Sequence, residues 1–322
     1  MKICSLLPSG TEILFELGLG DSIVGVTDLC DYPEAVTNKR IVSRSKIDVG
    51  ILTSEEVESE MHRMLDSDEP LFELDQDLLT QINPDVILTQ DLCYFCEIDA
   101  TVVRESVAGM PGIPDVLTLN PRTVAEVLQT IMDVGRCCDA FTAAESLVSQ
   151  LNQRVAFVKD RLLSVSNRPR AFSIEGVNPL VVGGHWIPDL FSIAGAASGP
   201  YTAGCDAERI DFEEIVKYKP EKLFIDLCSS DLERQFRELP WLINQDGWKN
   251  LPAVRTGEVY LIDHVYFSRP GPRIIKGLEI LAELMHPEYF SGMVPPGVVA
   301  KLRSDYLMSG WDGPITEMFQ TY

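Results

Sequence analysis

The stretch DQDLLTQINPDVILT (residues 75–89) is echoed far along the chain by DFEEIVKYKPEKLFI (residues 211–225). In each copy an acidic helix start leads into a helix with apolar residues at helical spacing, a proline ends that helix, and a short β-prone run follows. Each copy therefore predicts one helix-to-strand step. Two such steps predict two related α/β lobes whose strand-end loops face a ligand cleft between the lobes.

Composition places the chain among large globular proteins. It has 322 residues, of which 45% are apolar, so it can bury a sizeable core and has the length of two ordinary domains. Lys and Arg number 27 against 49 Asp and Glu, which gives a net charge of −22. This charge would repel a phosphate backbone, so nucleic acid is not an expected partner. No run approaches the roughly 20 apolar residues of a membrane span.

Motif order along the chain predicts the domain organisation. Strand and helix signals alternate through residues 1–121 and again through 168–286, and this order predicts a parallel sheet in each lobe. Residues 122–167 have no strand signal and keep apolar positions at helical spacing, which predicts one long helix that joins the lobes. Residues 287–322 form a C-terminal tail that the sequence constrains little.

The segment DLCYFCE (residues 91–97) directly follows the strand of the first echo and is therefore expected on the cleft side. Its Cys93 and Cys96 could clip a soft metal, form a redox couple or line the cleft, and these alternatives stay open. Asp91 and Tyr94 are expected ligand contacts in the same loop. A closed zinc ribbon is excluded because no second Cys-x-x-Cys pair exists in the sequence.

Two further loops bring aromatic and polar side chains to the same side. His185 and Trp186 follow two glycines, and a histidine nitrogen could reach a metal while a tryptophan ring could stack on a planar ligand. The third loop carries Tyr266, Phe267 and Arg269, and the arginine could hold a carboxylate or amide oxygen. Two of the four histidines, His62 and His286, are expected at the surface, and the usual catalytic motifs are missing from the sequence.

Taken together, these segments resemble the vitamin B12-binding members of the helical-backbone substrate-binding proteins of ABC importers. The resemblance covers about residues 1–287 and is carried by SLLPSGTE (5–12), CDYP (30–33), NPD (83–85), QDLC (90–93), GGHW (183–186) with AGA (194–196), and RPGPR (269–273). It implies the class III periplasmic-binding-protein fold, in which two Rossmann-like lobes are joined by a backbone helix. By motif position it also implies that Tyr32 lines the ligand site, and that Asp77 and Glu213 dock on a permease.

The predicted function is therefore non-enzymatic binding of cobalamin, or of a related corrinoid or metal chelate, with no required cofactor. The protein would then be the substrate-binding component of an ABC-type importer or a cytoplasmic relative of one. The alternative is a metal-dependent or cysteine enzyme that uses Cys93, Cys96 and His185 as metal ligands or reactive groups. Eight scattered cysteines and the lack of a leader in the sequence favour the cytoplasm, and export with removal of a leader is the other alternative.

Overall fold

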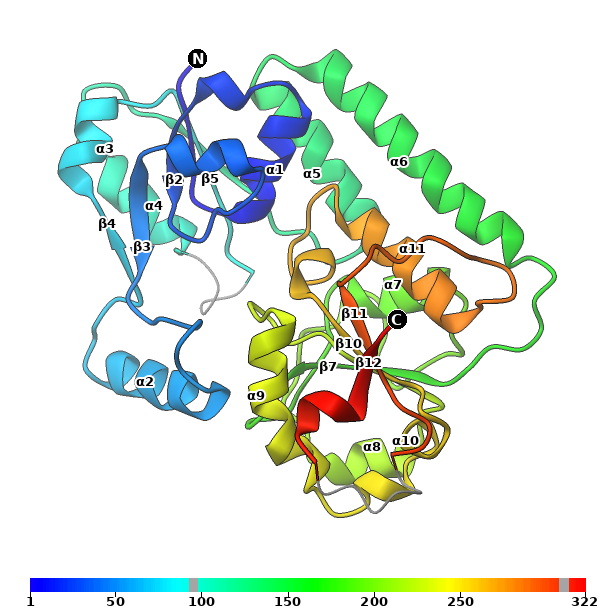
Figure 1. Ribbon diagram of the computed structural model, residues 1–322. Coiled ribbons are helices and arrows are strands. Elements are labelled where there is room, and N and C mark those ends of the chain that lie inside the picture. The colour runs from blue at the N-terminus through cyan, green and yellow to red at the C-terminus, as the bar shows by residue number, and fades with distance from the viewer. Residues whose placement is uncertain (93–97, 307–312) are drawn as a thin grey trace. The chain divides into compact units, whose positions relative to one another are not determined.

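The computed structural model describes residues 1–92, 98–306 and 313–322 (Figure 1). The chain divides into two compact units. Lobe 1 comprises Met1–Asp48, Ser59–Gln153 and Pro270–Pro272, and lobe 2 comprises Val49–Glu58, Arg154–Arg269 and Arg273–Tyr322. Among the described residues, no helix is both long enough and apolar enough to cross a membrane.

Lobe 1 is built on a six-stranded sheet with the strand order β4-β3-β2-β1-β5-β6. Its strands are β1 (Ile3–Ser5), β2 (Ile23–Thr27), β3 (Ile41–Ser45), β4 (Phe72–Leu74), β5 (Val86–Thr89) and β6 (Asp115–Thr118). Its helices are α1 (Pro8–Glu16), α3 (Gln76–Ile82), α4 (Ala100–Val107) and α5 (Val124–Cys137), while α2 (Ser54–Asp66) and α6 (Phe141–Arg161) cross the boundary between the two units.

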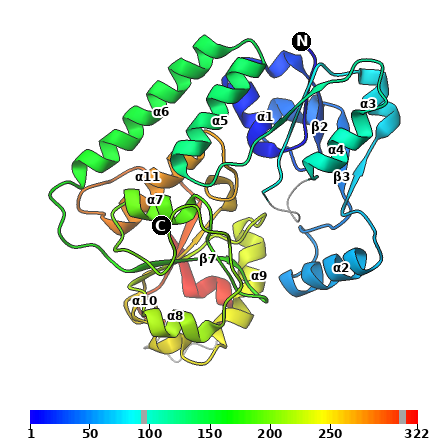
Figure 2. The same cartoon turned by 180° about the vertical axis from the view of Figure 1, so that it is seen from behind.

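Lobe 2 is built on a second six-stranded sheet with the order β12-β11-β10-β9-β7-β8. Its strands are β7 (Ala171–Gly176), β8 (Val181–Val182), β9 (Lys222–Ile225), β10 (Val259–Ile262), β11 (Val299–Leu302) and β12 (Phe319–Thr321). Its helices are α7 (Ile187–Ile193), α8 (Phe212–Tyr218), α9 (Leu232–Ile243), α10 (Pro252–Thr256) and α11 (Ile274–Met285). Both views show α8 and α10 at the same end of this lobe (Figures 1 and 2).

The two echoed stretches form the same local structure in the two lobes. Asn83 caps the C-terminus of α3 and Lys219 caps that of α8, and both residues have the left-handed backbone that closes a helix, with φ of 47° and 55°. A proline follows each of them, and the strands β5 and β9 begin two residues later. The predicted pair of α/β lobes is thus confirmed.

Both sheets are mixed, which corrects the prediction of purely parallel sheets. Strand β4 pairs antiparallel with β3, β8 pairs antiparallel with β7, and β11 pairs antiparallel with both β10 and β12. The last two strands come from the C-terminal segment after residue 286, so that segment extends the sheet of lobe 2. It contributes Phe319 and Met318 to the core of that lobe.

The helical segment between the sheets also differs from the prediction of one helix. Helix α5 ends at Cys137 and α6 begins at Phe141, and Asp139 between them has a left-handed backbone with φ of 56°. A residue in this conformation cannot continue a right-handed helix. The chain passes from lobe 1 to lobe 2 within the 21-residue helix α6.

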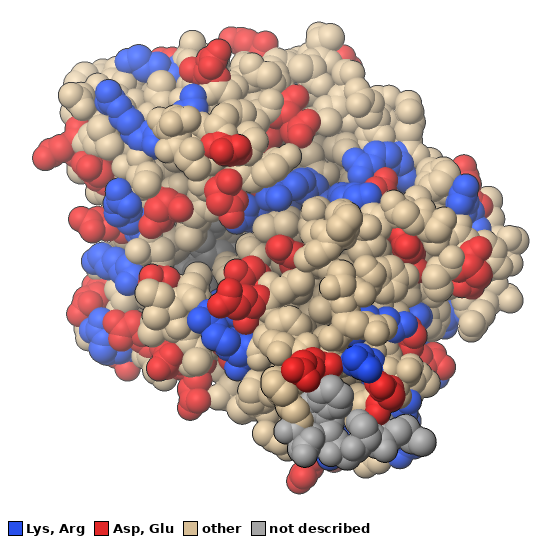
Figure 3. Space-filling view, viewed as in Figure 1, with Lys and Arg blue, Asp and Glu red and all other residues tan. Residues whose placement is uncertain are grey.

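Charged side chains of both signs are spread over the surface seen in Figure 3, with acidic groups interspersed among basic ones. Acidic side chains on this face are therefore exposed to solvent.

Candidate functional site

The Gly183–Trp186 loop of lobe 2 is held by main-chain hydrogen bonds to the segment 204–208. Val182 N donates to Glu208 O at 3.0 Å, and His185 N donates to Cys205 O at 2.6 Å. In the other direction, the Gly204 N–H donates to His185 O at 2.9 Å. The loop therefore continues the strand β8 alongside a second segment and has a fixed backbone.

Glycine at position 184 is required by this close approach. A Cβ atom at residue 184 would overlap the main-chain atoms of Asp206 and Ala207, which cannot move aside as a flexible side chain can. Glycine is the residue that lets two backbones approach so closely. The Gly-Gly pair ahead of His185 is thus explained by packing within lobe 2.

His185 itself has a left-handed backbone, with φ of 52°. Its side chain is 15% exposed, and Nε2 lies 3.9 Å from Oδ1 of Asp206, whose side chain is 70% exposed. The imidazole also lies beside the indole of Trp186, with ring centroids 5.7 Å apart and planes tilted by 31°. The imidazole is therefore mostly buried and lies next to an exposed carboxylate.

Trp186 and Phe267 are buried in lobe 2, with exposed fractions of 5% and 1%. The indole Nε1–H of Trp186 donates to Phe267 O at 2.7 Å, so the loop after β8 is tied to the loop after β10. In this structure the Trp186 indole and the Phe267 main-chain carbonyl join these loops. Contact of either ring with a ligand stays a prediction.

The loop after β10 starts with Asp263, whose side chain accepts a hydrogen bond from Val265 N at 3.1 Å. Burial raises the pKa of Asp263, and the charges of Arg273 and Arg269 act against this rise. Tyr266 and Arg269 are half-buried. Of the predicted residues of lobe 2, the structure thus brings His185, Trp186 and Phe267 together and leaves the ligand roles of Tyr266 and Arg269 as predictions.

Lobe 1 contributes Tyr32 and Asp91 from loops that follow β2 and β5. The Tyr32 side chain is 43% exposed. Asp91 supports its own loop, because its N–H donates to Asn120 Oδ1 at 2.7 Å and its Oδ1 accepts from Ala100 N at 2.8 Å, at the start of α4. Asp91 thus has a structural role in its loop, and its contact with a ligand stays a prediction.

Cys93, Tyr94 and Cys96 lie outside the residues that the structure describes. Within residues 1–92, 98–306 and 313–322, no three His, Cys, Asp or Glu side chains come together as metal ligands. The metal site predicted at Cys93, Cys96 and His185 therefore stays a prediction.

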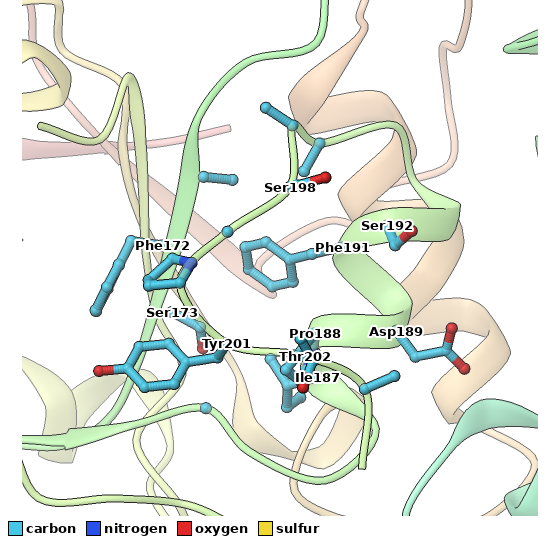
Figure 4. Close-up of a pocket in the computed structure, with 17 residues that line it drawn as sticks. Phe172, Ser173, Ile187, Pro188, Asp189, Phe191, Ser192, Ser198, Tyr201 and Thr202 are labelled. Atoms are coloured by element: carbon cyan, nitrogen blue, oxygen red, sulfur yellow. The ribbon is translucent and has the colours of Figure 1, made fainter. Parts of the chain in front are cut away.

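A cavity of about 270 Å³ lies in lobe 2 between β7, α7 and the segment 196–203 (Figure 4). The rings of Phe172, Phe191 and Tyr201 surround it, and Phe172 meets Tyr201 edge to face at a centroid distance of 6.0 Å. Ser173 also lines it, and the Ser173 hydroxyl donates to Asp226 Oδ1 at 2.6 Å.

Two residues near these loops were missed by sequence reasoning. Asp226 is 2% exposed, and burial raises its pKa from 3.8 to about 7. Its position directly after the strand of the second echo was a usable signal, since that edge of a sheet carries functional groups in α/β folds. Asp206 lies in a stretch of sequence that has no motif or periodicity to indicate a functional residue.

A family model described as "Periplasmic binding protein" matches residues 3–266 of this sequence. The chain belongs to the periplasmic binding protein family.

Similar proteins are known from several organisms. This chain is 26% identical over 295 residues to the uncharacterized ABC transporter substrate-binding lipoprotein YvrC of Bacillus subtilis, and the alignment covers 90% of this chain and 81% of YvrC. The crystal structure of the periplasmic vitamin B12 binding protein BtuF of Vibrio cholerae superposes with a TM-score of 0.63 at 17% identity, over 89% of this chain and 96% of BtuF. The periplasmic heme-binding protein RhuT of Roseiflexus gives a TM-score of 0.65 at 19% identity, over 89% of this chain and 98% of RhuT.

Family membership and fold confirm that the chain has the class III periplasmic-binding-protein fold and is a solute-binding protein. The prediction that it is not an enzyme is thereby confirmed, and the alternative of a metal-dependent or cysteine enzyme is set aside. Asp77 and Glu213, the predicted docking residues, are both exposed in the first turns of α3 and α8.

Proposed function

We propose that this family member is the substrate-binding component of an ABC-type importer and that it binds cobalamin or a related corrinoid or metal chelate. The observation that carries the proposal is the hydrogen-bonded loop that holds the mostly buried His185 imidazole beside the exposed Asp206 carboxylate in lobe 2, in a fold shared with B12-binding and heme-binding proteins. A histidine beside an aromatic ring suits a planar ligand that contains a metal. No resident cofactor is needed for this function.

The residues proposed to contact the ligand are distributed over both lobes. Lobe 1 supplies Tyr32, and its Cys93, Tyr94 and Cys96 are kept as proposed contacts. Lobe 2 supplies the loop of His185 and the loop of Tyr266 and Arg269. Tyr32 is the residue of this set whose ring is most open to a ligand among those described, with 43% of its surface exposed.

Calorimetric titration of the reduced protein with cyanocobalamin and dicyanocobinamide tests the proposal, after the metal content has been read by plasma mass spectrometry. We expect a dissociation constant below about 1 μM, which corresponds to about −8 kcal/mol. A ligand concentration of about one hundred times this constant would then stabilise the fold by about 2.7 kcal/mol and raise Tm by roughly 5 °C.

A matched pair of variants tests the role of the exposed tyrosine. Tyr32→Ala should weaken binding about tenfold, as the loss of an aromatic anchor does. Tyr289→Ala removes a tyrosine of similar exposure, 39%, that is not in the proposed set and should leave affinity unchanged. Failure of cyanocobalamin, dicyanocobinamide, hemin and ferric chelates alike to bind would sink the proposal.

The proposal also includes a permease partner and a cellular location. Asp77 in lobe 1 and Glu213 in lobe 2 are proposed to meet basic residues of a permease, because exposed carboxylates steer association with a basic surface. The names of the similar proteins, a lipoprotein and two periplasmic proteins, favour the exported alternative over the cytoplasmic prediction. Cell fractionation with an antibody against the chain distinguishes the two locations.

A further inference from the structure

The cavity between β7, α7 and the segment 196–203 is formed by lobe 2 alone (Figure 4). None of the described residues proposed to contact the chelate lines it. Its volume of about 270 Å³ is close to the roughly 300 Å³ at which pockets for small molecules begin. It also exceeds the roughly 150 Å³ of a protein cavity that holds benzene. The cavity therefore has room for one or two fused rings, and chelate binding leaves it without a role.

The aromatic walls of this cavity are packed from behind. Phe191 on α7 meets Phe224 edge to face at a centroid distance of 5.2 Å. Phe172 on β7 meets Tyr218 at 5.7 Å, and both phenylalanines are buried. Because other rings support them, the walls are in place before a ligand arrives. A preformed site binds at a lower cost in conformational entropy than one that must be assembled.

The outer wall, segment 196–203, is tied to the rest of lobe 2 near both of its ends. Ala197 N donates to Pro169 O at 2.9 Å, and Cys205 N donates to Thr202 O at 3.1 Å. Most of the residues between these two hydrogen bonds are exposed. A small molecule thus has a route from solvent into the cavity along a wall whose backbone is held.

Ser173 is the most buried of the polar side chains among the described lining residues. Its hydroxyl donates to Asp226 Oδ1 at 2.6 Å. A serine hydroxyl has one proton and two acceptor lone pairs, so the proton of Ser173 is already used and its oxygen can still accept. A ligand N–H or O–H group is the matching donor.

A second polar atom lies at the outer wall. The Tyr218 hydroxyl is buried and has no hydrogen-bond partner among the described residues. It borders Gly199 of the lining, because a Cβ atom at residue 199 would lie 3.8 Å from it. An unpaired buried hydroxyl costs free energy, and a polar group of a ligand at this wall would lower that cost.

The charge of the lining restricts the ligand further. Asp189 is its one charged residue among those described, and no described Lys or Arg lines the cavity. An anionic ligand would therefore lose its hydration and gain no cationic partner. Three aromatic rings with a buried acceptor favour an uncharged aromatic ligand.

We propose that this cavity is a second ligand site, which binds a small uncharged aromatic molecule of one or two fused rings that carries an N–H or O–H donor. The donor bonds to Oγ of Ser173, and the ring packs among Phe172, Phe191 and Tyr201. The site goes beyond the proposed function, because it lies within lobe 2 and uses none of the residues assigned to the chelate.

The test uses three probes of similar size in titrations followed by saturation-transfer NMR. Indole carries the donor, benzothiophene has nearly the same shape without an N–H group, and indole-3-carboxylate is an anion. We expect indole to bind with a dissociation constant of about 1 mM or below. Benzothiophene should bind about fivefold to tenfold more weakly, as the loss of one hydrogen bond predicts. Indole-3-carboxylate should not bind at about ten times that concentration.

Two variants locate the bound probe. Ser173→Ala should bring the affinities for indole and benzothiophene to within about twofold of each other, a change that general loss of structure would not produce. Tyr201→Ala should weaken indole roughly tenfold, as the loss of an aromatic contact does. Tyr289→Ala removes a tyrosine that does not line the cavity and should leave indole binding unchanged. Thermal melting of each variant shows whether it is folded.

The outcomes that overturn the second site are specific to it. They are failure of the wild type to bind indole, equal losses in Tyr201→Ala and Tyr289→Ala, and displacement of indole by cyanocobalamin. Equal binding of indole and benzothiophene by the wild type would overturn the role of Ser173. The titrations with corrinoids and hemin test the proposed function separately, so either proposal can fail while the other stands.

Discussion

Each lobe contains one helix-to-strand unit, α3 to β5 in lobe 1 and α8 to β9 in lobe 2. The two units have the same backbone conformation but carry different side chains at the strand end. The residue that follows β5 is the neutral Gln90, and the residue that follows β9 is the acidic Asp226, and both are buried. The first unit is also capped by Asp75, whose side chain accepts from Leu78 N, whereas Asp211 makes no side-chain cap. A repeated framework thus leaves the strand-end position free to carry a different group in each lobe.

The largest expected effect is on the pH dependence of stability, when the acidic Asp226 of lobe 2 is replaced by a neutral residue. Burial raises the pKa of Asp226 from 3.8 to about 7, so the folded state holds a proton that the unfolded state has lost. The free energy of unfolding should therefore fall as pH rises from 4 to above 7, by roughly 4 kcal/mol at about 1.4 kcal/mol per pKa unit. Asp226→Asn should remove this slope, which denaturant unfolding at several pH values measures. An unchanged slope in the variant would contradict the assignment.

The second effect concerns a cluster of charges at the start of the interior strand β10. Glu258 in lobe 2 is partly buried, which acts to raise its pKa, but hydrogen bonds from Lys222, Lys301 and Tyr260 lower it from 4.5 to about 2. Its stabilisation is thus present above pH 4.5 and lost as pH falls toward 2. Glu258→Gln should cost roughly 3 kcal/mol at pH 7 by chemical denaturation.

The matched control for the Glu258 variant lies in lobe 1. Glu73 is an exposed residue of β4, so Glu73→Gln should change the free energy of unfolding by less than about 0.5 kcal/mol. Similar losses in Glu258→Gln and Glu73→Gln would show that burial of the charge cluster in lobe 2 is energetically unimportant.

The third effect separates the two helix starts. Asp75→Ala removes a hydrogen bond of 2.8 Å to Leu78 N and should cost about 1 kcal/mol of stability. Asp211→Ala should cost only a few tenths of that, because no side-chain cap exists to lose. Thermal unfolding of both variants checks the difference. Equal losses of stability would mean that these acids stabilise the protein through the helix dipole and not through the side-chain cap.

The fourth effect concerns the two docking acids, whose replacement should change uptake more than stability. Asp77→Lys and Glu213→Lys should each cost at most about 1 kcal/mol, through an unfavourable charge at a helix N-terminus. Cobalamin affinity should stay within about twofold, while uptake should fall strongly in cells that rely on this chain as their binding protein. Normal uptake by the double variant would remove both residues from the docking proposal.

Much of the local structure could be predicted from the sequence. In the second echoed stretch, helix α8 (Phe212–Tyr218) ends just before Pro220 and strand β9 follows, in the order that the sequence predicts. The helix α9 was not predicted, and Pro240 lies inside it. Its buried Leu239 and Leu242 show how packing of an apolar face outweighs a residue that disfavours helix.

Burial of polar groups was harder to predict. His286 was expected at the surface, but it is 2% exposed, and its Nε2 lies 3.2 Å from Gly195 O. The sequence shows a histidine at a helix end before a proline, which is a common surface pattern. Its burial depends on a segment about 90 residues away, which no local pattern reports.

The candidate site divides in the same way. The place of His185 in a strand-end loop followed from the sequence, because glycines and β-prone residues signal turns and strands through local backbone preference. Its neighbour Asp206, the burial of Trp186 and the protonation of Asp226 were decided by tertiary structure. Side-chain contacts and pKa values depend on groups that the fold brings together from distant parts of the chain, so the sequence alone determined the framework and the tertiary structure decided its chemistry.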